Sequence, residues 1–326
     1  MNVAVVGLGS MGKRRIRLLK KYSETINIIG VDLEEARRND AKQEYGIQVT
    51  DNLEKLIENK KISAVFVCTA PLSHNAIITT ALSHKADVFT EINLVSDGYD
   101  KNIALAKENG VVLFLSSTFL YRDEIGYIEK QVKSLDENVN YSYHIGQYLP
   151  DWHPWEHYNN FFVGNKKTNG CREIFAIELP WLTKVFGEIK NIQVIKGKTT
   201  SLDIDYNDTY FVVLEHKNGN KGSLAVDVVS RKAVRNLEVY GEHLYMSWDG
   251  SPLGLYQYDL EQKKDNQIKL YDEVDHQEQY SSFVIENAYY NEIVSFFEVI
   301  DKKKDAIHTF KTDKEILGWI DKIEKI

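Results

Sequence analysis

The sequence is poor in the residues from which disulfide scaffolds and metal centres are built. Only two of its 326 residues are cysteines, Cys68 in an apolar run and Cys171 near a predicted helix start. They are far apart and lack metal-ligand spacing, so we expect two buried thiols. The histidines are scattered without paired-ligand spacing, and no GxSxG turn is present. The pattern therefore predicts no metal site and no serine nucleophile elbow.

Positive charge and long apolar runs are also scarce. The formal net charge is -8, and the one lysine run, 302–304, resembles a solvated loop rather than a basic stripe. This balance argues against a nucleic-acid partner. No apolar run is long enough to cross a bilayer, and the chain enters a predicted strand at residue 2 or 3, which leaves no room for a signal peptide. We expect a cytoplasmic protein with no membrane partner.

The length and composition predict an ordinary globular protein with two domains. A chain of 326 residues is too long for one compact core. Its residues are 43% hydrophobic and 27% charged, which is typical of soluble proteins.

Residues 3–32 read as a dinucleotide-binding unit of strand, glycine turn, helix and strand. The apolar run 3–6 leads into Gly7, Gly9 and Gly12, which fit GxGxxG, and Asp32 follows twenty residues after the last glycine. The glycines permit a tight turn, close approach of a pyrophosphate and close packing of the helix on the sheet. Phosphates would bind the helix N-terminus. The residues expected to line this turn are Gly7, Gly9, Ser10, Met11 and Gly12.

The acidic residue at the end of the second strand favours NAD over NADP. Asp32 is placed to accept hydrogen bonds from both ribose hydroxyls, and its charge would repel a 2′-phosphate. Arg37 and Arg38 temper this preference, although their spacing suits a solvated helix face.

The remaining pattern changes near residue 118. Up to that point short apolar strands alternate with helices, which predicts a parallel doubly wound α/β sheet in a domain of residues 1–118. Beyond it come a helix, an aromatic stretch at 141–162 and a second helix at 171–186. A series of β runs at 189–270 and two closing helices follow. We expect residues 119–326 to form an α+β domain with an open antiparallel sheet.

This order of elements resembles the Gfo/Idh/MocA family of sugar and inositol oxidoreductases over nearly the whole chain. The matching segments are GLGSMGKRRIRLL, TAPLSHNAIITTAL, VFTEINLVS, YLPDWHPWEHY, RKAVRNLEVYG and AYYNEIVSFFEVI. The aromatic segment is most similar to members of surface-polysaccharide and nucleotide-sugar pathways. The resemblance implies NAD as cofactor and a sugar-type substrate. It also implies further cofactor contacts at Thr69, Pro71, His74 and Glu91.

The departures from this family concern its proton-transfer residues. Members usually carry Glu-Lys-Pro after the fifth strand, where the lysine takes part in proton transfer, but this chain has Glu91, Ile92 and Asn93. Members also place Asp, His and Asp along the first long helix of the second domain. The corresponding slots are Ile174, Ile177 and Pro180. A register slip of one brings Glu173 or Glu178 into play but restores no histidine.

Alcohol oxidation still needs a base, and four side chains are candidates. They are His74, His153, His157 and Glu178. Each has a structural alternative: a histidine that caps backbone groups, an aromatic loop packed on itself, or a solvent-facing glutamate. The expected substrate contacts are Tyr121, Arg122, Trp152, Trp155 and Arg172. For the arginines the alternative is an ion pair, and Glu91 is more suited to shaping its turn than to chemistry.

Three functions fit these observations. The first is a nicotinamide-dependent oxidoreductase of a sugar or sugar derivative, with a rebuilt acid–base set. The second is a catalytically silent NAD-binding regulator or scaffold, and the third is an enzyme that uses NAD transiently for epimerisation, elimination or hydrolysis. An apolar open sheet face, with Phe211, Val213, Leu224 and Val226 among its residues, further predicts a homodimer or homotetramer.

Overall fold

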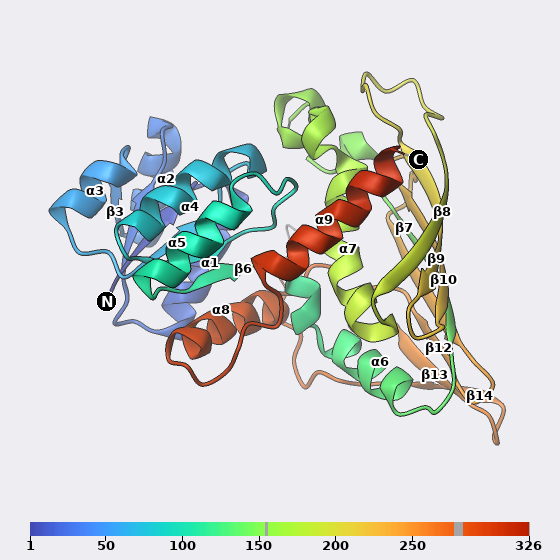
Figure 1. Cartoon of the computed structure of the whole chain (residues 1–326). Helices are drawn as coiled ribbons and strands as arrows, with labels where there is room; N and C mark the ends of the chain where they lie inside the picture. The colour runs from blue at the N-terminus through green and yellow to red at the C-terminus, as the bar shows by residue number, and fades with distance from the viewer. Residues whose placement is uncertain (154–155, 277–282, 326) are drawn as a thin grey trace. The chain divides into compact units, whose positions relative to one another are not determined.

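The chain folds into two compact units. The computed structural model describes residues 1–153, 156–276 and 283–325 (Figure 1). Unit 1 comprises Met1–Ser117 and Tyr289–Leu317, and unit 2 comprises Thr118–Ala288 and Gly318–Ile326. The sequence suggested two continuous domains divided after residue 118. In the structure, Tyr289–Leu317 belong to unit 1 although they lie near the end of the chain.

Unit 1 is built on a six-stranded parallel sheet in the order β3-β2-β1-β4-β5-β6. Its inner strands are buried on both faces, which explains their unbroken apolar runs. The expected doubly wound Rossmann sheet is confirmed. Its elements are β1 (Asn2–Val6), α1 (Ser10–Tyr22), β2 (Asn27–Val31), α2 (Glu35–Tyr45), β3 (Gln48–Thr50), α3 (Leu53–Asn59), β4 (Ala64–Val67), η1 (Pro71–Ser73), α4 (His74–Ser83), β5 (Asp87–Thr90), α5 (Tyr99–Asn109) and β6 (Leu113–Leu115).

Two late helices, α8 (Glu286–Ile300) and α9 (Phe310–Lys325), contribute residues to unit 1. Phe296 of α8 packs edge-on against three rings of the parallel sheet, with centroid distances of 5.3 Å to Phe66 and 5.6 Å to Phe89 and Phe114. These aromatic contacts explain why residues 289–317 fold with the first 117.

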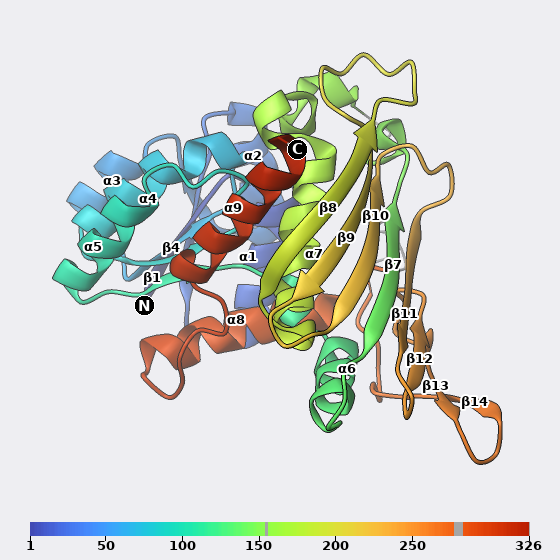
Figure 2. The ribbon, with the colours of Figure 1, turned by 45° about the vertical axis from the view of Figure 1, so that its right-hand side comes forward.

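Unit 2 contains an eight-stranded sheet in the order β14-β13-β12-β11-β7-β10-β9-β8. Helices α6 and α7 cover one face, and the other is open among the described residues (Figure 2). Its elements are η2 (Thr118–Tyr121), α6 (Asp123–Lys133), β7 (Asn140–Gly146), η3 (Leu149–Asp151), η4 (Tyr158–Asn160), η5 (Phe162–Gly164), η6 (Lys166–Thr168), α7 (Gly170–Phe186), β8 (Ile189–Gly197), β9 (Thr209–His216), β10 (Lys221–Asp227), β11 (Val234–Tyr240), β12 (Tyr245–Trp248), β13 (Leu255–Asp259) and β14 (Lys264–Gln267).

The open sheet is confirmed, with one difference from the expected antiparallel pattern. Strand β7, within the stretch described above only as aromatic, lies in the middle of the sheet and pairs in parallel with β10. Its side chains alternate: Tyr141, Tyr143 and Ile145 are buried, while Ser142 and His144 face the open side. This period-2 pattern was the signal for a strand.

Candidate functional site

The glycine turn between β1 and α1 has the geometry that a bound pyrophosphate requires. Gly7 has a φ of +90°, and a Cβ there would lie 2.7 Å from the carbonyl oxygen of Cys68. A Cβ on Gly12 would lie 1.8 Å from the carbonyl oxygen of Gly7, so α1 packs too closely on the turn for any side chain. At Gly9 a Cβ would meet no described atom within 4 Å. The turn is therefore tight against the protein and open on its outer side.

The start of α1 adds an electrostatic reason for anion binding. Ser10 and Met11 are its first two residues, and its N-cap is Gly9, which has no side chain to cap the helix. The exposed N–H dipoles of a helix N-terminus attract negative charge. A Cβ on Gly9 would fill the space in which a pyrophosphate would approach these groups, so the residues present fit a dinucleotide.

Asp32 follows β2 directly and is 9% exposed. Its Oδ2 accepts the Leu8 N–H at 2.7 Å, and its Oδ1 accepts the Glu34 N–H at 2.9 Å. Each carboxylate oxygen has two lone pairs, so each retains one acceptor site. The carboxylate is thus held rigidly by backbone donors and can still accept from a diol.

The residues that follow Asp32 include an exposed leucine and two arginines. Arg38 donates to the carbonyl oxygens of Asp32 and Leu33, both at 2.8 Å. Arg37 is half-exposed and pairs with Glu34 at 3.2 Å, and its Nη1 lies 3.9 Å from Asp32 Oδ2. Leu33 is 87% exposed. Arg38 therefore braces the end of β2 instead of lying free on a solvated helix face.

The turn after β4 contains Thr69, Pro71 and His74. His74 is 2% exposed, and both its ring nitrogens are engaged: Nε2 lies 2.8 Å from the Thr69 carbonyl oxygen and Nδ1 lies 2.7 Å from Asn93 Oδ1. Burial lowers the pKa of His74, although the hydrogen bond to Thr69 opposes the shift. A histidine bonded in this way holds the turn together and has no nitrogen left for a substrate proton.

Glu91 belongs to a buried ion cluster within unit 1. Arg15 is fully buried, and its guanidinium donates to Glu91 at 2.6 and 3.1 Å and to Glu292 at 2.7 Å. Glu292 also accepts from Ser116 Oγ and from the Ser117 N–H. Glu91 therefore anchors the end of β5 to α1 and α8, as expected for a residue that shapes its turn.

Glu178, the carboxylate candidate for the base, is fully buried in unit 2 and accepts four hydrogen bonds. Its Oε1 accepts from Arg235 Nη2 at 2.6 Å and from Nε at 3.2 Å. Its Oε2 accepts from Tyr143 at 2.9 Å and from Trp181 at 2.7 Å. Four bonds use the four lone-pair sites of a carboxylate. Glu178 is the counter-ion of Arg235 in this structure.

The two candidate substrate arginines also have carboxylate partners. Arg122 is 3% exposed and forms a two-pronged pair with Glu124, at 3.1 and 2.6 Å. Arg172 donates to Asp321 at 2.8 Å and to Glu324. Arg172 therefore ties α7 to α9, whereas Arg122 pairs with a carboxylate only two residues along the chain.

The aromatic candidates are placed less uniformly. Trp152 is half-buried and donates its Nε1–H to the Gln147 carbonyl oxygen at 3.0 Å, and Tyr121 is half-buried at the end of η2. Trp155 lies outside the described residues. His153 stacks on Phe161, with ring centroids 4.4 Å apart, and burial lowers its pKa.

His157 is exposed, and its Nδ1 accepts the Asn159 N–H at 3.3 Å. Of the candidate histidines, only His153 and His157 lie in a loop with exposed surface. Their proposed contact with a sugar stays a prediction.

Glu173, one turn into α7, differs from Glu178 in what its carboxyl group contacts. Its Oε2 is buried and has no hydrogen-bond partner among the described residues. Burial raises the pKa of Glu173 to about 7. A carboxyl group with an unused oxygen and a pKa near neutrality can take up or release a proton at working pH.

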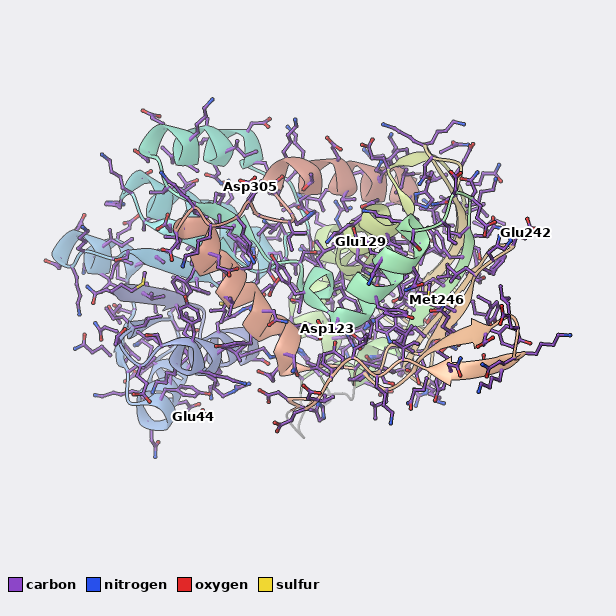
Figure 3. All side chains as sticks on the ribbon, turned by 90° about the horizontal axis from the view of Figure 1, so that it is seen from below. Glu44, Asp123, Glu129, Glu242, Met246 and Asp305 are labelled. Carbon is purple, nitrogen blue, oxygen red and sulfur yellow. The ribbon has the colours of Figure 1, made fainter. Side chains whose placement is uncertain are left out.

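Among the described residues, one group of three potential ligands has side-chain atoms close enough for a metal ion: Glu137, Glu242 and His243. Glu242 extends from the turn between β11 and β12 (Figure 3). His243 already pairs with Glu137 at 3.0 Å. This is an ordinary surface ion pair at a turn. Within the described residues, no helix has both the length and the hydrophobicity of a membrane span.

Comparison with known proteins agrees with this site. Residues 1–117 match the Gfo/Idh/MocA model, described as an oxidoreductase family with an NAD-binding Rossmann fold. The same segment is 28% identical, over 117 residues, to myo-inositol 2-dehydrogenase of Thermotoga maritima, and the match covers 35% of each chain. The resemblance stated above is confirmed for residues 1–117, which match a family model with an NAD-binding Rossmann fold.

Solved structures extend the likeness in fold to both units. UDP-N-acetylglucosamine 3-dehydrogenase from Acidithiobacillus ferrooxidans is 16% identical, with a TM-score of 0.75 over 99% of this chain and 96% of its own. A levoglucosan dehydrogenase, solved with NADH and levoglucosan, is 12% identical, with a TM-score of 0.81 over 99% and 96%. At these identities the likeness concerns the fold.

Sequence reasoning missed the residues whose roles depend on distant partners. Arg15 lies in the matched glycine segment, but the charge of an arginine after GxGxxG suggests a solvated helix. Asn93 was noted only as a departure from the family. The signal in the sequence was the presence of both an arginine in α1 and a glutamate after β5. Their separation along the chain gives no indication that the two side chains form an ion pair.

Proposed function

We propose that the protein transfers hydride between NAD and a sugar, because residues 1–117 match the model of the Gfo/Idh/MocA oxidoreductase family, which has an NAD-binding Rossmann fold. The observation that carries this proposal is the open turn at Gly9 beside the anchored carboxylate of Asp32. Bound NAD supplies the hydride acceptor. The carboxylate of Asp32 would orient the adenosine ribose and disfavour a 2′-phosphate, so NAD is preferred over NADP.

The proposed substrate class is the sugar portion of a nucleotide sugar. Two observations support it: the similarity of residues 148–158 to members of nucleotide-sugar pathways, and the shared fold with a UDP-N-acetylglucosamine 3-dehydrogenase. The aromatic side chains Trp152 and Phe161 are of the type that stacks on sugar rings.

For the acid–base role we propose Glu173 in place of the missing lysine and histidine. Ile92 and Ile177 cannot exchange protons, and His74 and Glu178 have used their hydrogen-bonding capacity on the protein. Glu173 keeps an unpartnered oxygen and has a pKa of about 7. It would take the hydroxyl proton as hydride leaves the same carbon.

The test is a turnover assay with NAD and a panel of nucleotide sugars and sugar acids, followed by nicotinamide absorbance. Glu173→Gln should lower kcat about a hundredfold, as loss of a positioned base typically does. Glu188→Gln is the matched control, because Glu188 is an exposed glutamate of the same unit, paired with Lys217. Unchanged turnover in Glu173→Gln would assign the base elsewhere, with His153→Ala and His157→Ala as the next variants.

A silent NAD-binding protein is the second candidate, and the occupied states of His74 and Glu178 favour it. This protein would bind NADH in a fluorescence titration yet oxidise no member of the panel with NAD. Turnover without net NADH formation would instead indicate transient use of NAD in epimerisation, elimination or hydrolysis.

A further inference from the structure

A small cavity within unit 1 lies beside Asn93, the residue that stands where the family has proline. The cavity has a volume of about 70 Å³, and its lining includes His74, Asn75, Asn93, Tyr99 and Phe310. Asn93 is 3% exposed. With its Oδ1 toward His74, its Nδ2 makes no hydrogen bond of normal geometry to the described residues, and the neighbouring Tyr99 hydroxyl donates its own hydrogen to Asp313. A buried donor left unpaired is costly, so this arrangement calls for an explanation.

The hydrogen-bonding needs of His74 explain why the Asn93 amide is placed in this way. A neutral imidazole carries one N–H, and the Thr69 carbonyl oxygen can only accept, so that proton must be on Nε2. The lone pair on Nδ1 then needs a donor. Turned by 180° about its last bond, the Asn93 amide presents Nδ2 to Nδ1 and Oδ1 to the cavity, which has room for water.

Tautomer control matters because of where Thr69 lies. A Cβ placed on Gly7 would lie 2.9 Å from Cγ2 of Thr69. The other close neighbour would be the carbonyl group of Cys68. The segment 68–69 is therefore one wall of the glycine turn. His74 reaches that wall through a single hydrogen bond, and the bond exists only while Nε2 carries the proton.

We propose that Asn93 is a positioning residue of the nucleotide site, which fixes His74 as its Nε2–H tautomer and thereby holds Thr69 against the glycine turn. This deepens the proposed function, because it concerns the cofactor site of the same reaction. Thr90 Oγ1 lies 3.3 Å from His74 Nδ1, but its one hydrogen is donated to the Glu91 carbonyl oxygen. Asn93 is therefore the donor that His74 Nδ1 needs. The carboxylate whose charge acts on His74, that of Glu91, is paired with Arg15.

Two substitutions separate the donor role of Asn93 from its shape. Asn93→Leu keeps the volume and removes the donor, so His74 loses the bias toward Nε2–H. Asn93→Asp offers only acceptor oxygens when ionised, so it should bind an imidazolium in which both nitrogens carry protons. The aspartate variant thus keeps the bond to Thr69, and the leucine variant does not. Asn75→Ala is the control, since Asn75 lines the same cavity but bonds Asn102.

The measurements are NADH affinity by fluorescence and the tautomer of His74 by long-range ¹H–¹⁵N NMR of the full chain, with His74→Gln to identify its signals. We expect an Nε2–H tautomer in the wild type and roughly tenfold weaker NADH binding in Asn93→Leu, the size of effect that an unsatisfied buried group produces. Asn93→Asp should show an imidazolium and bind NADH within about threefold of wild type, as the Asn75→Ala control should.

An Nδ1–H tautomer or a protonated His74 in the wild type, or wild-type affinity in Asn93→Leu, would overturn the proposal. If Asn93→Leu does not fold, the charge state and affinity of Asn93→Asp decide the matter. If the wild type binds no NADH at all, the proposed function fails, while the NMR spectrum still tests the link between Asn93 and His74.

Discussion

Both units bury arginine against glutamate, but with different stoichiometry. In unit 1 a single guanidinium, Arg15, serves two buried carboxylates, Glu91 and Glu292. In unit 2 the arginines that face fully buried carboxylates pair one to one, Arg122 with Glu124 and Arg235 with Glu178. Arg172 also pairs with two carboxylates, Asp321 and Glu324, but both are partly exposed to solvent. The cluster of unit 1 should therefore lose more stability when its arginine is removed, because both buried carboxylates depend on the same guanidinium.

The units also differ in the polar atoms that they leave available. In unit 1 the backbone N–H groups near Gly9 and lone pairs on the Asp32 carboxylate are available, and they suit the binding and orientation of a nucleotide. In unit 2, the buried side-chain atoms without a partner in the described part of the chain include one carboxyl oxygen, on Glu173, which suits proton exchange. The comparison teaches that the type of a titratable residue says little about its role, and that its remaining hydrogen-bonding capacity says more.

The largest expected effect is the loss of the shared cation. Arg15→Leu should lower the free energy of unfolding by about 3–5 kcal/mol, because removing one partner leaves buried carboxylates uncompensated. Arg122→Leu should cost less, since it strands only Glu124. Denaturant unfolding measures both, with the exposed pair of Lys133 and Glu129 as the control through Lys133→Ala. Equal losses for the two arginines would contradict the comparison.

The next effect is a pH dependence of stability from Glu173. Its pKa is about 7 in the folded protein and 4.5 in its ordinary state, so the folded protein binds the proton more tightly. The stability from this group is full below about pH 4.5 and is lost as the pH rises through about 7. Relative to wild type, Glu173→Gln should gain roughly 3 kcal/mol between these limits. Parallel stability curves for wild type and Glu173→Gln would contradict the assignment.

A smaller effect is expected at the ribose carboxylate of unit 1. Asp32→Ala removes the acceptor for the ribose hydroxyls and should weaken NADH binding roughly tenfold, about the value of a charged hydrogen bond. NADPH binding should weaken less or improve, because the repulsion of its phosphate disappears. Fluorescence titration with both cofactors measures the preference. Tighter binding of NADPH by the wild type would refute the expected preference for NAD.

The smallest effect on stability is expected on the open sheet face of unit 2. Phe211 and Val213 are 57% and 54% exposed there, beside a groove of about 580 Å³. Leu224 and Val226, which were expected on the same face, are buried. We propose a second copy of the chain as the occupant of the groove, because exposed apolar side chains on an open sheet favour association. Phe211→Glu should change stability by less than about 0.5 kcal/mol yet shift light scattering toward monomer. Leu260→Glu, at an exposed turn, is the control, and a monomeric wild type would refute association.

Local patterns in the sequence were enough for the nucleotide turn. The spacing of Gly7, Gly9 and Gly12 and the position of Asp32 depend on residues within one βαβ unit, and backbone sterics enforce them locally. The alternation of strands and helices likewise predicted the parallel sheet. The strand at residues 140–146 was missed because its buried residues are mostly tyrosines, which also suit a loop.

The sequence by itself therefore determined the nucleotide-binding turn and the presence of Ile92 where the family that the chain resembles has lysine. Only the tertiary structure decided which charged residues are already paired. Arg15 meets carboxylates 76 and 277 residues away in the chain, and Glu178 meets Arg235 57 residues away. Periodicity reports on neighbours along one element, whereas the pairing of a buried charge depends on which elements pack against it. For that reason Glu173, and not Glu178, emerges as the available carboxyl group.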